Sequence, residues 1–96
     1  MTGFINKLLE GENTVTERDK QELLHALFTA HYHALVAAAY RLCSNRELAE
    51  DIVQNTFVVA QVRIDVLAAV DNQRAWLYKV MQNVIGDVYR RQKAME

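Results

Sequence analysis

Proline is absent from this 96-residue chain, and glycine occurs only at Gly3, Gly11 and Gly86. Because proline and glycine are the residues that most strongly interrupt α-helices, almost nothing along the chain breaks a helix. Alanine, leucine, glutamine, glutamate and arginine, which favour helices, are plentiful. Hydrophobic residues make up 51% of the chain, which suffices for one packed core. The sequence therefore predicts one small all-α domain.

Apolar residues recur at helical spacing over residues 16–43, which predicts the first long helix. Thr14 and Glu17 have the spacing of a capping box at its start. Residues 2–10, TGFINKLLE, have the pattern of a short amphipathic helix that precedes it. The side chains of the long helix that are predicted to pack are Leu23, Leu24, Leu27, Phe28, Leu35, Val36, Ala39 and Leu42.

The second helix is predicted over residues 46–62, with Ser44 and Glu47 as its capping box. Its stretch AEDIVQNTF has one face that is predicted to be buried, formed by Ala49, Ile52, Val53, Thr56 and Phe57. Another face of this helix contains Asp51, Gln54, Asn55 and Val58. An ordinary solvated helix face is usually richer in Lys, Arg and Glu than this one. The face therefore indicates either a surface that contacts a partner or an ordinary solvated face.

The third helix is predicted over residues 73–93, with Asp71 or Asn72 as its cap. Residues 63–72 are predicted to form a loop with at most one helical turn. Three long helices on short connections predict an antiparallel bundle. The apolar stripe of the third helix contains Leu77, Val80, Met81, Val84, Ile85 and Val88. Its opposite edge contains Lys79, Asn83, Gly86, Asp87 and Arg90, and Arg91 and Lys93 follow.

Charge is distributed unevenly along the chain. Residues 1–73 contain six Lys/Arg and ten Asp/Glu, a balance of −4, whereas residues 74–96, from Arg74 onward, have a balance of +3. Basic side chains attract phosphates, and an amide such as that of Asn83 can read a base edge. The third helix is therefore a candidate nucleic-acid surface. The alternative is a solvated face with a basic end, since the helix dipole favours Lys and Arg there.

Other classes of function find little support. His25, His31 and His33 lack the shared helix face and the further ligands that a metal site needs, so no metal or cofactor is predicted. The lone Cys43 excludes a disulfide framework and fits a reducing cytoplasm. No apolar run has the length of a membrane span, and residues 1–13 do not resemble a signal peptide. No catalytic constellation appears, so the chain is not predicted to be an enzyme.

Three stretches together resemble conserved region 2 of bacterial sigma factors, most closely that of the extracytoplasmic-function (ECF) group. LFTAHYHALVAAAYRLCSN (27–45) is similar to the opening helix of that family. RELAEDIVQNTFVVAQ (46–61) is similar to its segment AEDLVQETF, and DNQRAWLYKVMQNVIGDVYRR (71–91) to its segment NPRAWLxxIARNxxxDxxRR. The last two motifs occur in the family's order and at its distance, which makes the resemblance specific.

The resemblance implies two contacts in transcription initiation. The family's second helix docks on the clamp helices, a coiled coil of the β′ subunit of core RNA polymerase; the matching residues here are Asp51, Gln54, Asn55 and Val58. The third helix and the segment 64–73 before it would bind the non-template strand of the minus-ten promoter element and help to melt it. The residues expected to contact DNA are Arg74, Lys79, Asn83, Asp87, Arg90 and Arg91. The family usually also has an anti-sigma partner.

This chain departs from the family pattern at two informative positions. Asn55 stands where the family usually has glutamate, and Gln73 where it often has proline, so we expect a less fixed start of the third helix. Residues 1–15 are predicted to be an extension and residues 16–96 the region 2 domain. The family's second promoter-binding domain is absent, which indicates one domain of a longer protein. Two alternatives remain: a helical adaptor or oligomerisation module that does not bind DNA, and a sigma-like protein that binds only polymerase.

Overall fold

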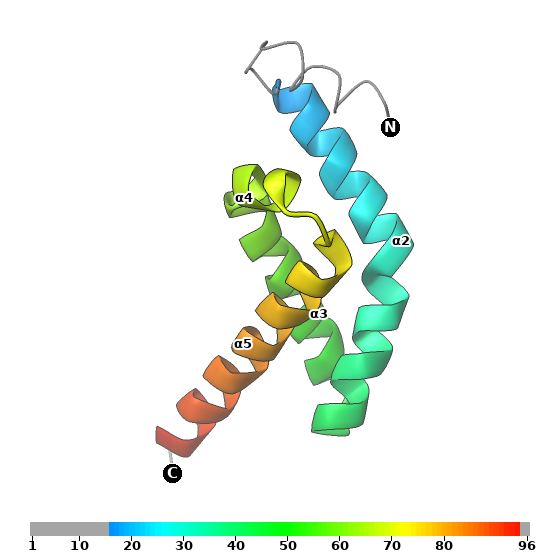
Figure 1. The fold of residues 1–96 in the computed structure, drawn as a ribbon. Coiled ribbons are helices and arrows are strands. Elements are labelled where there is room, and N and C mark those ends of the chain that lie inside the picture. The colour runs from blue at the N-terminus through cyan, green and yellow to red at the C-terminus, as the bar shows by residue number, and fades with distance from the viewer. Residues whose placement is uncertain (1–15, 95–96) are drawn as a thin grey trace.

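The computed structural model describes residues 16–94, which form four helices (Figure 1). These are α2 (Glu17–Cys43), α3 (Arg46–Val62), α4 (Ile64–Ala69) and α5 (Gln73–Ala94). The first two form an antiparallel hairpin, and α5 crosses α3 and runs back toward the end at which α2 terminates (Figure 1). The predicted all-α class is confirmed. The predicted amphipathic turns at residues 2–10 lie outside the described residues.

The core lies where the apolar faces of the three long helices meet. All five residues of α3 that were predicted to be buried are buried. In α5, the predicted apolar stripe is buried at four positions and partly buried at Val80 and Val88. Two predicted core residues of α2 are instead only partly covered, with Phe28 41% and Leu42 58% exposed. Helical spacing therefore identified the buried faces, but not where along α2 the neighbouring helices cover them.

The first helix begins two residues later than its predicted capping box requires. Thr16 is the N-cap: its hydroxyl accepts a hydrogen bond from the Asp19 amide (3.1 Å), and the Asp19 carboxylate accepts one from the Thr16 amide (3.3 Å). Thr14 lies outside the described residues, and Glu17 is already the first helical residue. The prediction was wrong because TVTERD contains two overlapping threonine-to-acid spacings, and either of them satisfies the pattern.

The turn between α2 and α3 also differs from its prediction. Ser44 ends α2 in the left-handed conformation (φ 57°), and its amide donates to the carbonyl of Tyr40 (2.8 Å). Asn45 is the N-cap of α3, and its side-chain oxygen accepts from the Leu48 amide (3.0 Å). An N-cap needs extended backbone, which a residue in the left-handed region cannot provide. The predicted box of Ser44 and Glu47 is therefore wrong.

Candidate functional site

The mixed polar face of α3 is exposed to solvent. Its residues Asp51, Gln54, Asn55 and Val58, here called the α3 row, are all exposed, and Val58 is 55% exposed. Asp51 forms no ion pair within residues 16–94. A carboxylate without an internal partner, two amides and an exposed valine form a surface on which a partner could satisfy its own donors and bury an apolar side chain.

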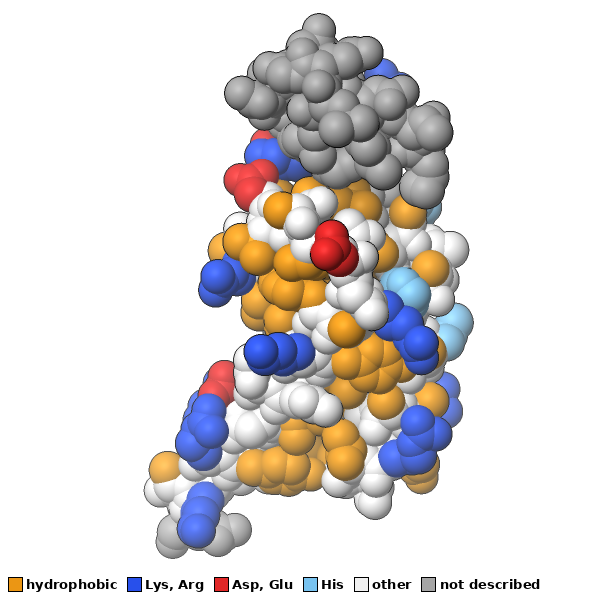
Figure 2. Space-filling view, in the orientation of Figure 1, with side chains coloured by type: hydrophobic (Ala, Val, Ile, Leu, Met, Phe, Trp, Pro, Cys, Tyr) orange, Lys and Arg blue, Asp and Glu red, His pale blue; other side chains and the backbone are white. Residues whose placement is uncertain are grey.

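The opposite edge of α5 is a second exposed face. Lys79, Asn83 and Arg90, here called the α5 row, repeat at helical spacing and are exposed. Lys and Arg side chains gather along the lower left of the molecule, where Figure 1 draws α5 (Figure 2). Asp87 lies beside this row and forms an ion pair with Arg90. The basic surface therefore contains one carboxylate, which partly neutralises its neighbour.

Gly86 and Arg91 complete this part of α5. Arg91 Nε donates to the backbone carbonyl of Asp87 (3.5 Å) and the residue stays exposed. A Cβ atom added at Gly86 would meet a guanidinium nitrogen of Arg90 at 3.5 Å, an ordinary van der Waals distance. Packing within the described residues therefore does not require glycine at this position. The space above Gly86 is occupied by a side chain that can move, so a ligand could approach the backbone there.

Arg74 does not share a face with the α5 row. It lies in the first turn of α5, about 140° around the helix axis from Lys79. Its guanidinium lies over the ring of Tyr78, 5.4 Å from the ring centroid. The structure thus groups Lys79, Asn83 and Arg90, with Asp87 and Arg91 beside them, and places Arg74 apart from them next to the turn that precedes α5.

The segment before α5 is more ordered than its predicted loop. Residues 64–69 form α4, and Ile64 and Leu67 are buried in the core. Asn72 caps α5, as one of the two predicted alternatives, by accepting from the Ala75 amide (3.0 Å). The side chain of Gln73 donates to the carbonyl of Leu67 (3.2 Å). The side chain of Gln73 thus ties the start of α5 to α4, a contact that the sequence did not predict.

Sequence reasoning missed the contact that joins α4 to α2. Lys20 Nζ lies 3.3 Å from a carboxylate oxygen of Asp65 and 3.5 Å from one of Glu17. The hydrogen bond to Asp65 and the charge of that carboxylate raise the pKa of Lys20 above its ordinary value of 10.5, and Glu17 adds to this effect. Lys20 and Asp65 are far apart in sequence, so no local pattern indicates their pairing.

The raised pKa of Lys20 predicts how this contact depends on pH. A group whose pKa is higher in the folded state than in the unfolded state stabilises the fold, and this stabilisation is complete below pH 10.5. It is lost as the pH rises through the raised pKa. We expect Lys20→Met, which keeps an apolar stem, to lower the melting temperature modestly at pH 7 to 9. The difference from the wild type should narrow above pH 10.5. Melting curves followed by circular dichroism measure it, and a difference that grows with pH would contradict the assignment.

The other candidate side chains are either not grouped as a metal site would require or bonded to backbone carbonyls. Among residues 16–94, no group of three His, Cys, Asp or Glu side chains is placed to bind a metal ion. Cys43 is half-buried, and its thiol donates to the carbonyl of Asn45 (3.3 Å). The hydroxyl of Tyr89 donates to the carbonyl of Leu42 (3.4 Å), which joins the end of α5 to the end of α2.

No helix in the described part of the chain combines the length and the apolar character that crossing a membrane requires.

Comparison with known proteins identifies the family of this chain. The chain matches the family model for sigma-70 region 2 over residues 27–95, which is more than half of its length. It belongs to the sigma-70 region 2 family. Searches of curated proteins and of solved structures find no match. Sigma-70 region 2 is a non-enzymatic domain of transcription initiation, and membership implies binding to core RNA polymerase and recognition of promoter DNA in general.

The sigma-70 region 2 match does not extend over the whole of α2. It begins at Leu27 and includes α3, α4 and α5, so that both the α3 row and the α5 row lie within it. The first ten residues of α2, residues 17–26, precede the match. Those residues include Lys20, which contacts α4.

Proposed function

We propose that the chain is the promoter-recognition domain of an ECF-type sigma factor. In this proposal the α3 row docks on the clamp helices of the β′ subunit of RNA polymerase. The α5 row and the segment of α4 with the turn after it bind the minus-ten promoter element. The observation that carries the proposal is that one domain of this family leaves two separate exposed faces unused by its core, one mixed and one basic.

The chemistry of the α3 row suits a docking surface. Asp51 can accept hydrogen bonds from an arginine of the partner, and such charge-assisted bonds are the stronger ones. Gln54 and Asn55 each offer a donor and an acceptor, and short side chains lose little rotamer freedom when they are fixed. Val58 adds a small apolar contact beside them. Neither amide provides a charge, so Asp51 would make the strongest polar contact.

The α5 row suits single-stranded DNA as the duplex opens. Lys79 and Arg91 would attract phosphates directly, and Arg90 would do so after its exposed ion pair with Asp87 opens. Opening an ion pair this exposed costs little free energy, because water already screens it. Asn83 would read one base edge. Promoter opening then needs no catalytic group, because binding the unpaired strand shifts the population toward the open form.

An anti-sigma protein would act on the same surfaces. A partner that covers the α3 row prevents docking on polymerase, and one that covers the α5 row prevents contact with DNA. The charge balance of −4 over residues 1–73 supports a second candidate function, in which the chain binds polymerase but not promoter DNA. This candidate would leave the α3 row as the functional surface and the α5 row as a solvated face.

Two single substitutions separate reading of bases from attraction to phosphates. The probe is a library of single-stranded oligonucleotides with randomised minus-ten bases, bound to the complex of the chain with core RNA polymerase. Asn83→Ala should reduce discrimination at one base position by about fivefold to 150-fold, the equivalent of about 1–3 kcal/mol. Arg90→Ala should weaken all sequences alike and flatten the slope of log affinity against log salt by about 0.7–1.

Arg18→Ala is the matched control for Arg90→Ala, since it removes the same charge from an exposed position in the first turn of α2. It should leave both the base preference and the salt slope unchanged. Equal losses of base preference in Asn83→Ala and Arg90→Ala would reject the proposed division of roles. A wild-type chain that binds polymerase, while the complex captures no oligonucleotide, would favour the second candidate.

A further inference from the structure

Tyr89 lies where α5 passes the end of α2, and it is 43% exposed. Its hydroxyl donates to the backbone carbonyl of Leu42 (3.4 Å), and Leu42 is itself 58% exposed. This hydrogen bond directs the aromatic ring across the junction between the two helices. The structure therefore holds an aromatic ring and a neighbouring aliphatic side chain at the surface, and the helices of residues 16–94 cover them only in part.

The anchoring hydrogen bond gives Tyr89 only a small structural role. At 3.4 Å it is longer than the distance of about 2.5–3.0 Å that is usual for a hydroxyl donor, so it contributes little to stability. An aromatic side chain that serves the core is covered by it, as Phe57 is at 6% exposed. The exposed part of the Tyr89 ring is therefore available to a ligand.

Tyr89 borders the α5 row. It lies about 80° around the helix axis from Lys79, on the side of α5 that meets the end of α2. Along the axis it lies about 9 Å beyond Asn83. A single strand that follows the α5 row therefore passes Tyr89 soon after it passes the amide of Asn83.

Cationic side chains flank this ring on both helices. Lys93 is exposed and follows Tyr89 by one turn of α5. Arg41 is exposed in the last turn of α2, next to Leu42, and forms no ion pair within residues 16–94. Hydrophobic side chains lie beside the Lys and Arg side chains at this end of the molecule (Figure 2). An exposed aromatic ring among cations is typical of surfaces that bind single-stranded nucleic acid.

We propose that the ring of Tyr89 stacks on one base of the single-stranded minus-ten element, with Leu42 in contact beside it. The inference rests on the proposed function and adds to it a contact that selects no sequence, because every base has an aromatic face. Lys93 and Arg41 attract the phosphates on either side of that base. Successive phosphates of a stacked strand are about 3.4 Å apart, so the stacked base lies at most about three nucleotides from the base that Asn83 reads.

Removal of single bases from the DNA tests the proposal. The probe is the tightest-binding oligonucleotide of the randomised minus-ten library, made abasic at one position at a time and bound to the complex of the full chain with core RNA polymerase. Loss of the stacked base should weaken binding to the wild type by about fivefold to 150-fold. Tyr89→Ala should weaken binding to the intact oligonucleotide by the same factor, and loss of that base should then cost nothing further. Tyr89→Phe keeps the ring without its hydroxyl and should bind like the wild type.

Tyr40→Ala is the matched control, because Tyr40 is 48% exposed in the last turn of α2 and lies about 160° around that helix from Leu42. It should bind like the wild type. Binding by Tyr89→Phe as weak as that by Tyr89→Ala would assign Tyr89 to anchoring α5 and overturn the proposal. An equal cost of every abasic position in the wild type and in Tyr89→Ala would also overturn it, while the proposed function stands. A wild-type complex that captures no oligonucleotide would overturn both.

Discussion

Replacing Asp51 and Gln54 together by alanine is expected to weaken binding to the β′ clamp coiled coil by about 30-fold or more, the equivalent of about 2 kcal/mol. Both side chains are exposed, and Asp51 has no ion pair within residues 16–94 that its loss would disturb. The substitution should therefore remove contacts with the partner while the bundle stays folded. Biolayer interferometry with immobilised coiled coil measures the change in affinity.

The two single substitutions measure how much each side chain contributes to this loss of affinity. Asp51→Ala should cost more than Gln54→Ala, because hydrogen bonds to a charged group contribute more than those between neutral groups. Glu22→Ala is the matched control, since it removes one exposed carboxylate from α2 and should bind like the wild type. Full affinity in the double variant would reject the α3 row as the docking surface. The basic α5 row would then be the remaining candidate for function.

Leu77→Ala is expected to lower the free energy of unfolding by about 2–5 kcal/mol. Leu77 is fully buried, so the substitution removes apolar contacts and leaves a cavity in the core where α5 packs. A chain of this size has a total stability of about 5–14 kcal/mol, so the loss is a large fraction of it. Urea unfolding followed by circular dichroism at low temperature measures the change.

Leu42→Ala is the matched control because it makes the same substitution at a residue that is 58% exposed. Its backbone carbonyl, which accepts from Tyr89, is unchanged by the substitution. The expected cost is below about 1 kcal/mol, as for most surface positions. In both variants, the slope of the unfolding free energy against urea concentration should equal that of the wild type. Equal costs at the two positions would mean that the end of α2 is covered in solution and that the described burial of the core is incomplete.

The functional faces could be predicted from the sequence because each belongs to one helix. Helical periodicity relates a residue only to neighbours three or four positions away, and these relations survive whatever the helix packs against. Once Ile52, Val53 and Phe57 are assigned to the core, the exposure of Asp51 and Gln54 follows. The same argument on α5 gave Lys79, Asn83 and Arg90 as one exposed row. Which macromolecule binds each row stays a prediction.

Local capping patterns were less reliable than periodicity. The sequence offers two overlapping boxes before α2 and two adjacent capping residues, Ser44 and Asn45, before α3. Choosing among them depends on backbone conformation, such as the left-handed Ser44, which the pattern does not specify. Similarly, Phe28 has helical core spacing, yet neighbouring helices cover it only in part.

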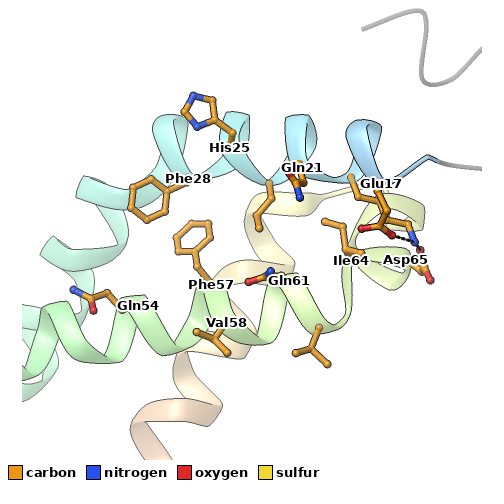
Figure 3. A pocket seen from close by; sticks show the side chains of 13 residues that line it. Glu17, Gln21, His25, Phe28, Gln54, Phe57, Val58, Gln61, Ile64 and Asp65 are labelled. Carbon is orange, nitrogen blue, oxygen red and sulfur yellow. Dashed lines mark ion pairs between the residues drawn. The ribbon is translucent and has the colours of Figure 1, made fainter.

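The sequence by itself determined the all-α class, the three long helices and the faces they bury, because these depend on the absence of proline and on periodicities within one helix. Only the tertiary structure decided that residues 64–69 form a helix. Leu67 of α4 is buried in the core, its carbonyl accepts a hydrogen bond from Gln73, and Asp65 forms an ion pair with Lys20. It also decided the groove between α2 and α3, which Phe28 and Phe57 both line (Figure 3). The physical reason is that a periodicity within one helix carries no information about its neighbours. Lys20 contacts Asp65, and Phe28 contacts Phe57, only when separate helices pack.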